Sequence, residues 1–433
     1  MKRRNGLTAL VAGGVAAATT ANAVKPFATK GTAAVPSFAS GLLTSELPRE
    51  TAALQVATLA GLAATGRVHG ITGRLATLAT LGSLAGLATL DRVAARSGEV
   101  LEAALVEALG ADYRNALGTY EARPVGAPLR RVDVRVRFKA DRRQFVRGPV
   151  LTYGDAGRRN ELDVWRRSDL RSDAAAPVLL QIHGGAWTIG KKETQGVPLM
   201  KHLAAQGWVC VAINYRLSPR DGWPAHIIDV KRAIAWIRAN IADHGGNPDF
   251  VAITGGSAGG HLASLAALHP NVAAYQPGFE EVDTTLQAAV PFYGVYDFTN
   301  RDGTGGADLI PLLEEKVFKT TFADDREAWE LASPMSHVGP DAPPMFLLHG
   351  TNDSLVPLAQ ARSMVQMLRT ASNQTVAYAE MPKAQHAFDI LGSVRAAHTA
   401  RAVGRFLSHT HASWATSELT ADTGQATERS PAM

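Results

Sequence analysis

A serine, an aspartate and a histidine each follow an apolar stretch of the chain, and their types are those of a catalytic group. They are Ser257, Asp353 and His386, and the apolar stretches before them are residues 250–253, 345–348 and 376–381. A serine hydroxyl becomes nucleophilic when a histidine removes its proton, and an acid must hold that histidine in the correct tautomer. This order therefore predicts acyl transfer, with Ser257 as nucleophile, Asp353 as orienting acid and His386 as general base.

The residues around Ser257 have the pattern of a sharp turn between a strand and a helix. Gly255 and Gly259 flank the serine in a G-x-S-x-G arrangement, and leucines at helical spacing follow over residues 262–268. Only small neighbours tolerate such a turn, which lifts the serine hydroxyl clear of the sheet. An ordinary glycine-rich turn is the alternative, and the flanking strand and helix patterns favour the nucleophile elbow.

A pair of glycines after another apolar strand supplies candidate hydrogen-bond donors for an oxyanion. The sequence His-Gly-Gly-Ala-Trp at residues 183–187 follows the predicted strand at residues 178–182. Without a Cβ atom, the backbone N–H groups of glycine can point into a site unobstructed. We expect the N–H groups of Gly184, Gly185 and Ala258 to form an oxyanion hole. A plain Gly-Gly turn is the alternative.

Two aromatic residues, Trp187 and Tyr293, lie at predicted strand ends and are candidates for lining the substrate pocket. Packing in the core explains them equally well. The single cysteine, Cys210, lies in an apolar run and is expected to be a packed core residue. The predicted chemistry needs neither a metal ion nor a cofactor.

The elements that must position these residues begin near residue 148. From there to residue 412, apolar strand patterns alternate with amphipathic helix patterns. This alternation predicts an α/β domain with a mostly parallel central sheet and helices on both faces. The carboxyl ends of parallel strands meet at one edge of the sheet, where chemistry collects. Residues 301–337 interrupt the alternation and are a candidate helical lid.

Residues 1–95 differ from the rest of the chain because they are apolar and rich in Ala, Gly and Thr. Residues 1–23 resemble a signal peptide, with a basic start and an Ala-Asn-Ala sequence at the end. Two interpretations stay open for the whole region. It forms two or three membrane helices, with Arg67 and Arg74 on the inner side and the C-terminal domain outside, or it forms Ala-rich helices of a soluble cap. The lack of a charged face favours membrane association.

Between the two regions, residues 96–147 are expected to form an amphipathic helix and then a basic connector. Within the connector, residues 132–138 alternate between polar and apolar types, which predicts an edge strand. The net charge of +5 is modest and comes largely from this connector, so nucleic-acid binding is not indicated. Residues 413–433 are polar and are expected to be a disordered tail.

Several motifs in this order resemble those of a known family. They are His-Gly-Gly-Ala-Trp, Asn-Tyr-Arg-Leu-Ser-Pro, Gly-Gly-Ser-Ala-Gly-Gly-His, Gly-Thr-Asn-Asp-Ser-Leu-Val-Pro and Gln-His-Ala-Phe. The chain resembles hormone-sensitive-lipase-like carboxylesterases of the α/β-hydrolase superfamily, above all the Lip-type esterases of actinobacteria and mycobacteria. The resemblance implies an α/β-hydrolase fold, the triad Ser257, Asp353 and His386, and an oxyanion loop at residues 183–185. One departure is Gly256, where many relatives carry Asp or Thr.

These observations predict a serine carboxylic ester hydrolase that forms an acyl-enzyme on short- to medium-chain esters. Its expected substrate is a small-molecule or lipid-like ester, and its expected location is a membrane or the cell envelope, with the cytoplasm left open. The His-Gly-Gly-x-Trp sequence also resembles that of kynurenine formamidases, so an arylformamidase-like amidase is the first alternative. A non-catalytic, membrane-anchored binding protein on the same fold is the second.

Overall fold

The computed structural model describes residues 2–117, 145–301, 303–305 and 308–428. The predicted edge strand at residues 132–138 lies outside the described residues. The strands form a nine-stranded sheet in the order β1-β3-β5-β4-β6-β7-β8-β9, with β2 paired to β3. Their bounds are β1 Phe145–Arg147, β2 Leu151–Thr152, β3 Glu161–Arg167, β4 Ala176–Ile182, β5 Val209–Ile213, β6 Gly246–Gly256, β7 Ala288–Phe292, β8 Met345–Gly350 and β9 Val376–Met381.

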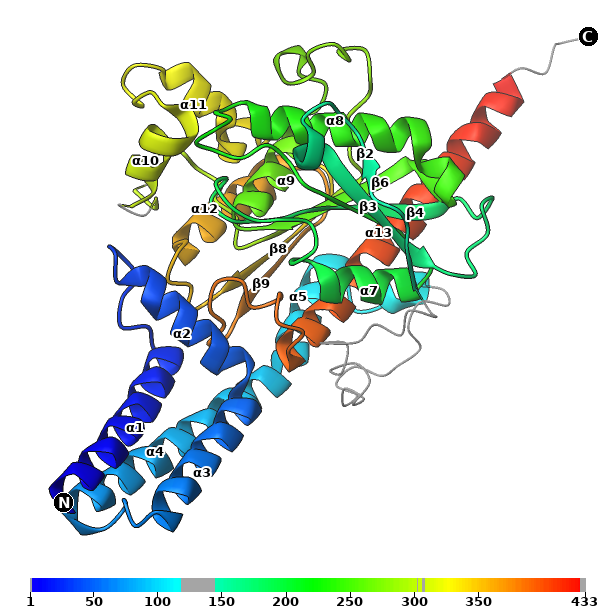
Figure 1. The fold of residues 1–433 in the computed structure, drawn as a ribbon. Coiled ribbons are helices and arrows are strands. Elements are labelled where there is room, and N and C mark those ends of the chain that lie inside the picture. Colours follow the sequence, from blue (N-terminus) through cyan, green and yellow to red (C-terminus); the bar gives the residue numbers. More distant parts are fainter. Residues whose placement is uncertain (1, 118–144, 302, 306–307, 429–433) are drawn as a thin grey trace, which may run out of the picture.

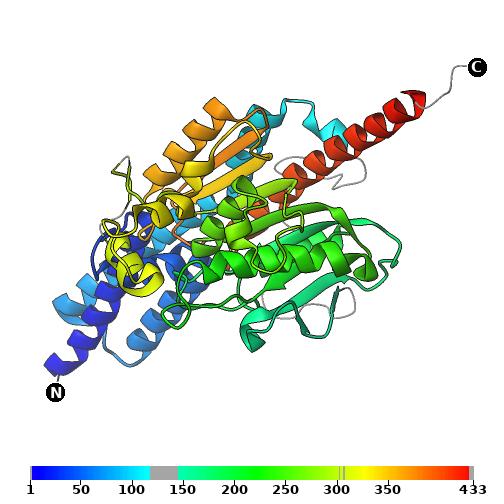
Figure 2. The ribbon, with the colours of Figure 1, turned by 90° about the horizontal axis from the view of Figure 1, so that it is seen from above.

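The sheet is parallel from β5 to β9 and antiparallel at the edge formed by β1, β2 and β3. Helices cover both of its faces (Figures 1 and 2). The main helices of this domain are α7 Val197–Ala205, α8 Ala225–Asn240, α9 Ala258–Leu268, α10 Leu309–Leu312, α11 Arg326–Ala332, α12 Leu358–Ala371 and α13 Val394–Glu428. The predicted α/β-hydrolase arrangement is therefore present, and α10 and α11 lie in the predicted insertion.

The strands are apolar at nearly every position because both faces of the sheet are covered. In β4, Val178 and Leu180 belong to the core on the α8 and α9 side, whereas Leu179 belongs to the core on the α7 and α13 side. Every residue of β5 is buried, and Cys210 is a fully buried free thiol in the second core. The expectation of a packed core cysteine is confirmed.

The C-terminal segment differs from the expectation of a disordered tail at residues 413–433. Helix α13 continues through most of it, to Glu428. In its third and fourth turns, α13 packs in the core through Val403, Phe406 and Leu407, which are fully buried. Adding residues to an existing helix is much easier than starting one, so a polar segment without proline extends it.

The N-terminal region consists of helices that project away from the sheet, with the N-terminus at the far tip (Figure 1). Its elements are α1 Lys2–Val24, α2 Ala34–Glu46, α3 Pro48–Ala64 and α4 Gly70–Ala95. The predicted amphipathic helix, α5 Ser97–Leu109, packs on β9 and α13 and so belongs to the α/β domain. Among the described residues, Gly6–Val24 and Gly70–Leu109 are long and apolar enough to cross a membrane, and only 33% and 28% of these spans are buried.

A buried ion pair joins α2 to the α/β domain. The guanidinium of Arg395 donates to Glu46, and the hydroxyl of Ser393 donates to the same carboxylate at 2.7 Å. The side chains of Glu46 and Arg395 are both fully buried. Removing one partner of such a pair leaves the other charge buried without compensation, which costs far more than the pair itself contributes.

We predict that Arg395→Ala destabilises the protein by about 3–5 kcal/mol, because the Glu46 carboxylate then stays buried and unpaired. Thermal unfolding of the purified protein would measure the change. Arg326→Ala is the matched control, since the Arg326–Glu330 pair is exposed, and it should leave the midpoint nearly unchanged. Equal midpoints for the two variants would contradict the prediction.

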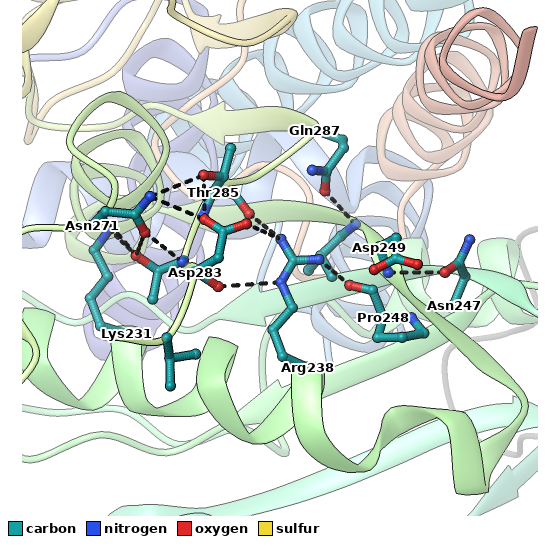
Figure 3. A network of polar contacts seen from close by, with 12 residues as sticks. Lys231, Arg238, Asn247, Pro248, Asp249, Asn271, Asp283, Thr285 and Gln287 are labelled. Atoms are coloured by element: carbon teal, nitrogen blue, oxygen red, sulfur yellow. Dashed lines mark hydrogen bonds and ion pairs between the residues drawn. The ribbon is translucent and has the colours of Figure 1, made fainter. Parts of the chain in front are cut away.

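A second buried cation, Lys231, lies on α8. Its ammonium group donates to the carbonyl oxygens of Ala266 and His269, at 3.1 and 2.9 Å, and to the hydroxyl of Thr284 at 3.2 Å. Figure 3 shows Lys231 and Arg238 with the polar side chains of the neighbouring loop, and Arg238 donates to the carbonyl of Thr285 at 2.6 Å. Burial lowers the pKa of Lys231 to about 7, although the charge of Asp283 opposes the shift.

This lowered pKa predicts a pH dependence of stability. Between about pH 7 and pH 10 the unfolded chain holds a proton on Lys231 that the folded chain has released, so stability rises with pH in this window. In Lys231→Met this contribution is absent. We expect the urea midpoint to rise more between pH 7 and pH 9 in the wild type than in the variant. Parallel curves for the two proteins would show that Lys231 does not titrate there.

Candidate active site

Ser257 occupies the sharp turn between β6 and α9, with φ 57° and ψ −122°. Its N–H donates to the carbonyl of Phe292 at 3.0 Å, and its own carbonyl accepts from the N–H of His261 at 2.9 Å. A Cβ atom at Gly255 would lie 2.5 Å from the Gly259 carbonyl oxygen. Such a turn is strained for a residue with a side chain, and it persists because these close contacts fix the backbone around it.

The glycine at position 256 has a specific neighbour. A Cβ atom there would lie 2.6 Å from the phenolic oxygen of Tyr293. Tyr293 is fully buried, its hydroxyl is hydrogen-bonded to Asp389, and its ring centroid lies 4.5 Å from that of His386. A larger residue at position 256 would therefore clash with this tyrosine.

The sequence left Tyr293 open between lining the pocket and packing in the core. It is buried in the core and is not among the residues around the cavity at Ser257. It packs behind the imidazole of His386 and beside the turn that carries Ser257. Burial raises the pKa of Tyr293 well above its usual value, and the charge of Asp389 adds to the shift. Burial also raises the pKa of Asp389. Tyr293 therefore stays protonated at neutral pH, and its ring packs against the imidazole of His386.

Asp353 and His386 are joined by a hydrogen bond across two loops. The Nδ1 atom of His386 lies 2.7 Å from Oδ2 of Asp353, and both side chains are almost completely buried. The other carboxylate oxygen accepts the N–H groups of Leu355 and Val356, each at 2.8 Å. Burial raises the pKa of Asp353, but the charge of His386 and hydrogen bonds from His349 and His386 outweigh it and hold the pKa far below its usual value.

Two further residues, not recognised in the sequence, complete this arrangement. The Nε2 atom of His349, at the end of β8, lies 3.2 Å from Asp353. Gln385 accepts the N–H groups of Ser354 and His386 through its side-chain oxygen, at 2.7 and 2.8 Å. It therefore clamps the loop after β8 to the loop after β9. The position of Gln385 immediately before His386 was the only signal in the sequence.

The glycine loop after β4 differs in one respect from the expected oxyanion hole. The N–H group of Gly184 donates to Oε1 of Gln195 at 2.7 Å, so it is already engaged within the protein. For the N–H groups of Gly185 and Ala186, the described part of the chain offers no acceptor. Ala186 also lines the cavity at Ser257. The expectation that Gly184 is a free donor is thus wrong, because no local pattern shows that Gln195, eleven residues later, accepts its N–H group.

The remaining expected donor, Ala258, is the first residue of α9. The first N–H groups of an α-helix have no partner within the helix, and they point toward its N-terminal end. Gly184 still has a steric role, since a Cβ atom there would lie 3.1 Å from Cβ of Ser257. The loop at residues 184–186 and the start of α9 therefore meet beside the serine side chain.

His183 lies at the end of β4 and is buried, with its Nδ1 atom 2.8 Å from the carbonyl oxygen of Gly184. Its ring stacks on that of Tyr215, whose hydroxyl donates to the His183 carbonyl at 2.9 Å. Burial lowers the pKa of His183 to about 4, with the Gly184 hydrogen bond opposing the shift. His183 is therefore neutral at pH 7 and orders the glycine loop.

A cavity of about 270 Å³ adjoins Ser257. Trp187 is one of its walls, as expected, and the indole N–H donates to Nδ1 of His261 at 3.2 Å. Leu309 and Leu312 of α10 form another wall, and residues adjoining Asp353 form a third. The cavity also includes residues between 29 and 35, from the N-terminal region, which the sequence did not connect with the site. No cluster suited to a metal ion occurs among the described residues.

Comparisons with known proteins identify the family to which this chain belongs. A family model described as BD-FAE matches residues 162–368. The chain is 50% identical over 405 residues to the probable carboxylic ester hydrolase LipM of Mycobacterium tuberculosis, which covers 93% of each chain. It is 49% identical over 316 residues to esterase LipQ of the same organism, covering 72% of this chain and 75% of LipQ.

Among solved structures, a thermophilic esterase of Thermogutta terrifontis, Est2, with butyrate bound, has a TM-score of 0.51. Its sequence is 24% identical, and the match covers 59% of this chain and 90% of Est2. This likeness concerns the fold, whereas the match to LipM spans most of the chain and extends into the N-terminal helices. The chain therefore belongs to the family of carboxylic ester hydrolases that includes LipM and LipQ, and its fold is that of an α/β-hydrolase.

Proposed function

We propose that this protein is a serine carboxylic ester hydrolase with Ser257 as nucleophile, His386 as general base and Asp353 as the acid that orients it. The observation that carries the proposal is the buried hydrogen bond of 2.7 Å between His386 and Asp353. It fixes the imidazole with Nδ1 as the donor, which leaves Nε2 as the atom that accepts a proton. The strained backbone of Ser257 and the cavity beside it support the assignment.

In this mechanism Ser257 attacks the ester carbonyl while His386 takes the hydroxyl proton. The tetrahedral intermediate collapses when His386 gives that proton to the leaving alcohol, and an acyl-enzyme remains. Water, deprotonated by the same imidazole, attacks the acyl group and releases the acid. The low pKa of Asp353 keeps its carboxylate charged throughout, so it stabilises the imidazolium in both steps.

The oxyanion donors in this proposal are the backbone N–H groups of Gly185, Ala186 and Ala258. Gly185 and Ala258 are retained from the sequence prediction, and Ala186 takes the place of Gly184. Support comes from the bond between Gly184 and Gln195 and from the position of Ala186 on the wall of the cavity. Each donor of this kind contributes about 3 kcal/mol to transition-state stabilisation.

The cavity size supports an ester with a short to medium acyl chain. Sites for drug-sized molecules have volumes from about 300 Å³ upward, and this cavity holds about 270 Å³. Its walls are mostly apolar, with Trp187, Leu309 and Leu312 among them. A chain of a few carbons fits this space, and the rest of a larger ester stays outside.

The N-terminal helices anchor the protein in a membrane in this proposal. Charged residues are absent from three stretches, residues 5–24 of α1, 51–64 of α3 and 75–90 of α4. At about 1.5 Å per helical residue these stretches are about 21–30 Å long, and the longest, in α1, matches the hydrocarbon thickness of about 30 Å. A soluble core helix is mostly buried, whereas about two thirds of the α1 span is not. Arg67 and Arg74 at the tip favour the inner side.

Residues 1–23 remain part of this anchor rather than being removed as a signal peptide. The predicted cleavage site is buried, since Asn22 and Ala23 are 2% and 3% exposed. The Asn22 side chain donates to the Ser37 carbonyl at 2.7 Å, and Thr20 and Ser83 hydroxyls lie 2.7 Å apart between α1 and α4. Loss of these residues would remove contacts from both α2 and α4.

We predict that Ser257→Ala abolishes hydrolysis of p-nitrophenyl butyrate, by about a millionfold, and also abolishes labelling by a fluorophosphonate probe. Asp353→Asn should lower kcat about ten-thousandfold because the imidazole loses its correct tautomer. Ser413→Ala, an exposed serine on α13, is the control and should match the wild type. Wild-type activity in Ser257→Ala would refute the proposal. Faster cleavage of N-formylkynurenine than of simple esters would select the amidase instead.

We also predict that Leu312→Trp shifts the preferred acyl chain toward shorter lengths, because the added ring fills part of the cavity. The ratio of octanoate to acetate hydrolysis should fall about tenfold, as expected for steric exclusion of a few methylenes. Leu331→Trp on α11, partly exposed and outside the cavity, is the matched control. An unchanged ratio of octanoate to acetate hydrolysis in Leu312→Trp would show that the acyl chain does not bind in this cavity.

A further inference from the structure

The segment between α1 and α3, residues 25–46, is here called the strap. It contains α2 and connects two of the apolar helices. Thr29, Gly31, Ala34 and Val35 of the strap line the same cavity as Ser257. The N–H group of Gly31 donates to the carboxylate of Asp308, just before α10, at 2.6 Å. The strap and the insertion therefore form adjoining parts of the wall around the serine.

The strap also contacts the loops that carry Asp353 and His386. The ring of Phe38 meets the imidazole of His386 edge to face, with centroids 5.8 Å apart. The side chain of Asn352 donates to the carbonyls of Ala23 and Val24, each at 3.0 Å, where α1 ends. With Glu46 held by Arg395 at the other end, the strap is fixed on the catalytic domain at both ends.

The strap carries several exposed apolar side chains. Phe27, Val35 and Leu43 are 68%, 61% and 53% exposed. Phe27 lies between two exposed lysines, Lys25 and Lys30. Aromatic side chains and lysines gather at the boundary between hydrocarbon and lipid headgroups, where lysine binds anionic lipid. The strap begins directly after the apolar span of α1, so it lies where that span would leave a bilayer.

We propose that the strap rests on the bilayer surface and presents the Ser257 cavity to it, so that the substrate is an acyl ester of a bilayer-resident lipid. This inference rests on the proposed serine hydrolase activity and on the N-terminal anchor. The short acyl group enters the cavity past Val35, while the remainder of the lipid stays in the membrane. The cavity is too small for a whole lipid. The strap follows α1 directly in the chain, and both carry exposed apolar side chains.

The test compares two esters with the full chain reconstituted in vesicles of phosphatidylcholine and anionic phosphatidylglycerol. One is a diacylglycerol with a hexadecanoyl and a butanoyl chain, held in the bilayer, and the other is dissolved p-nitrophenyl butyrate. Phe27→Asp and Leu43→Asp should each slow butyrate release from the lipid about tenfold, since a buried apolar contact with the membrane is lost. Hydrolysis of the dissolved ester should change less than about twofold.

Val150→Asp is the matched control, because Val150 is 51% exposed and lies at the antiparallel edge of the sheet, and it should leave both rates unchanged. Unchanged lipid hydrolysis in both strap variants, or an equal loss on the two esters, would overturn the inference. Lipid hydrolysis by Ser257→Ala would instead refute the serine mechanism itself, so the two failures are distinguishable.

A second variant tests the charged rim without altering an apolar side chain. Replacing both lysines, Lys25→Glu with Lys30→Glu, should lower the ratio of lipid hydrolysis on anionic to neutral vesicles by about fivefold or more. The dissolved ester should again be cleaved at the wild-type rate. An unchanged ratio would show that the strap does not contact the headgroups and would overturn the inference.

Discussion

The buried carboxylate of Asp353 is the constraint on which the rest of the site depends. A charge in the interior is tolerated only when hydrogen bonds and an opposite charge replace its lost hydration. Here two backbone N–H groups of its own loop and the rings of His349 and His386 supply them. These contacts fix the loop after β8 and draw the loop after β9 onto it. The orientation of the His386 imidazole thus follows from the hydrogen bonds that the Asp353 carboxylate requires.

The same edge of the sheet collects the other parts of the site, because parallel strands end there together. The turn after β6 carries Ser257, the loop after β4 brings the glycines, and Tyr293 follows β7. Tyr293 links these parts, since it occupies the space beside Gly256 and packs against His386. Gly256 is therefore needed because Tyr293 occupies the adjoining space, whereas Gly255 is needed because the turn itself is tight.

The N-terminal region is more than an attachment to this domain. Its contacts with Asn352, Asp308 and Arg395 reach the loop after β8, the insertion and the start of α13. Residues of the strap form part of the wall of the cavity at Ser257. The position of the N-terminal helices therefore affects the shape of that cavity. If α2 moved away from α13, the charges of Glu46 and Arg395 would lose each other as partners. Because a buried charge without a partner destabilises the folded protein, this ion pair holds α2 against the α/β domain.

The sequence alone determined the α/β alternation, the turn at Ser257 and the pairing of Asp353 with His386, because these depend on local patterns and on chain order. It left Tyr293 open between the pocket and the core, and it predicted Gly184 as an oxyanion donor and residues 413–433 as a disordered tail. Only the tertiary structure showed that Tyr293 is buried beside His386, that Gly184 donates to Gln195 and that α13 runs to Glu428. The roles of Gln385 and the strap also came from the tertiary structure alone. Each depends on contacts between segments far apart in the chain, and a local pattern carries no record of which distant side chain fills a space or occupies a donor.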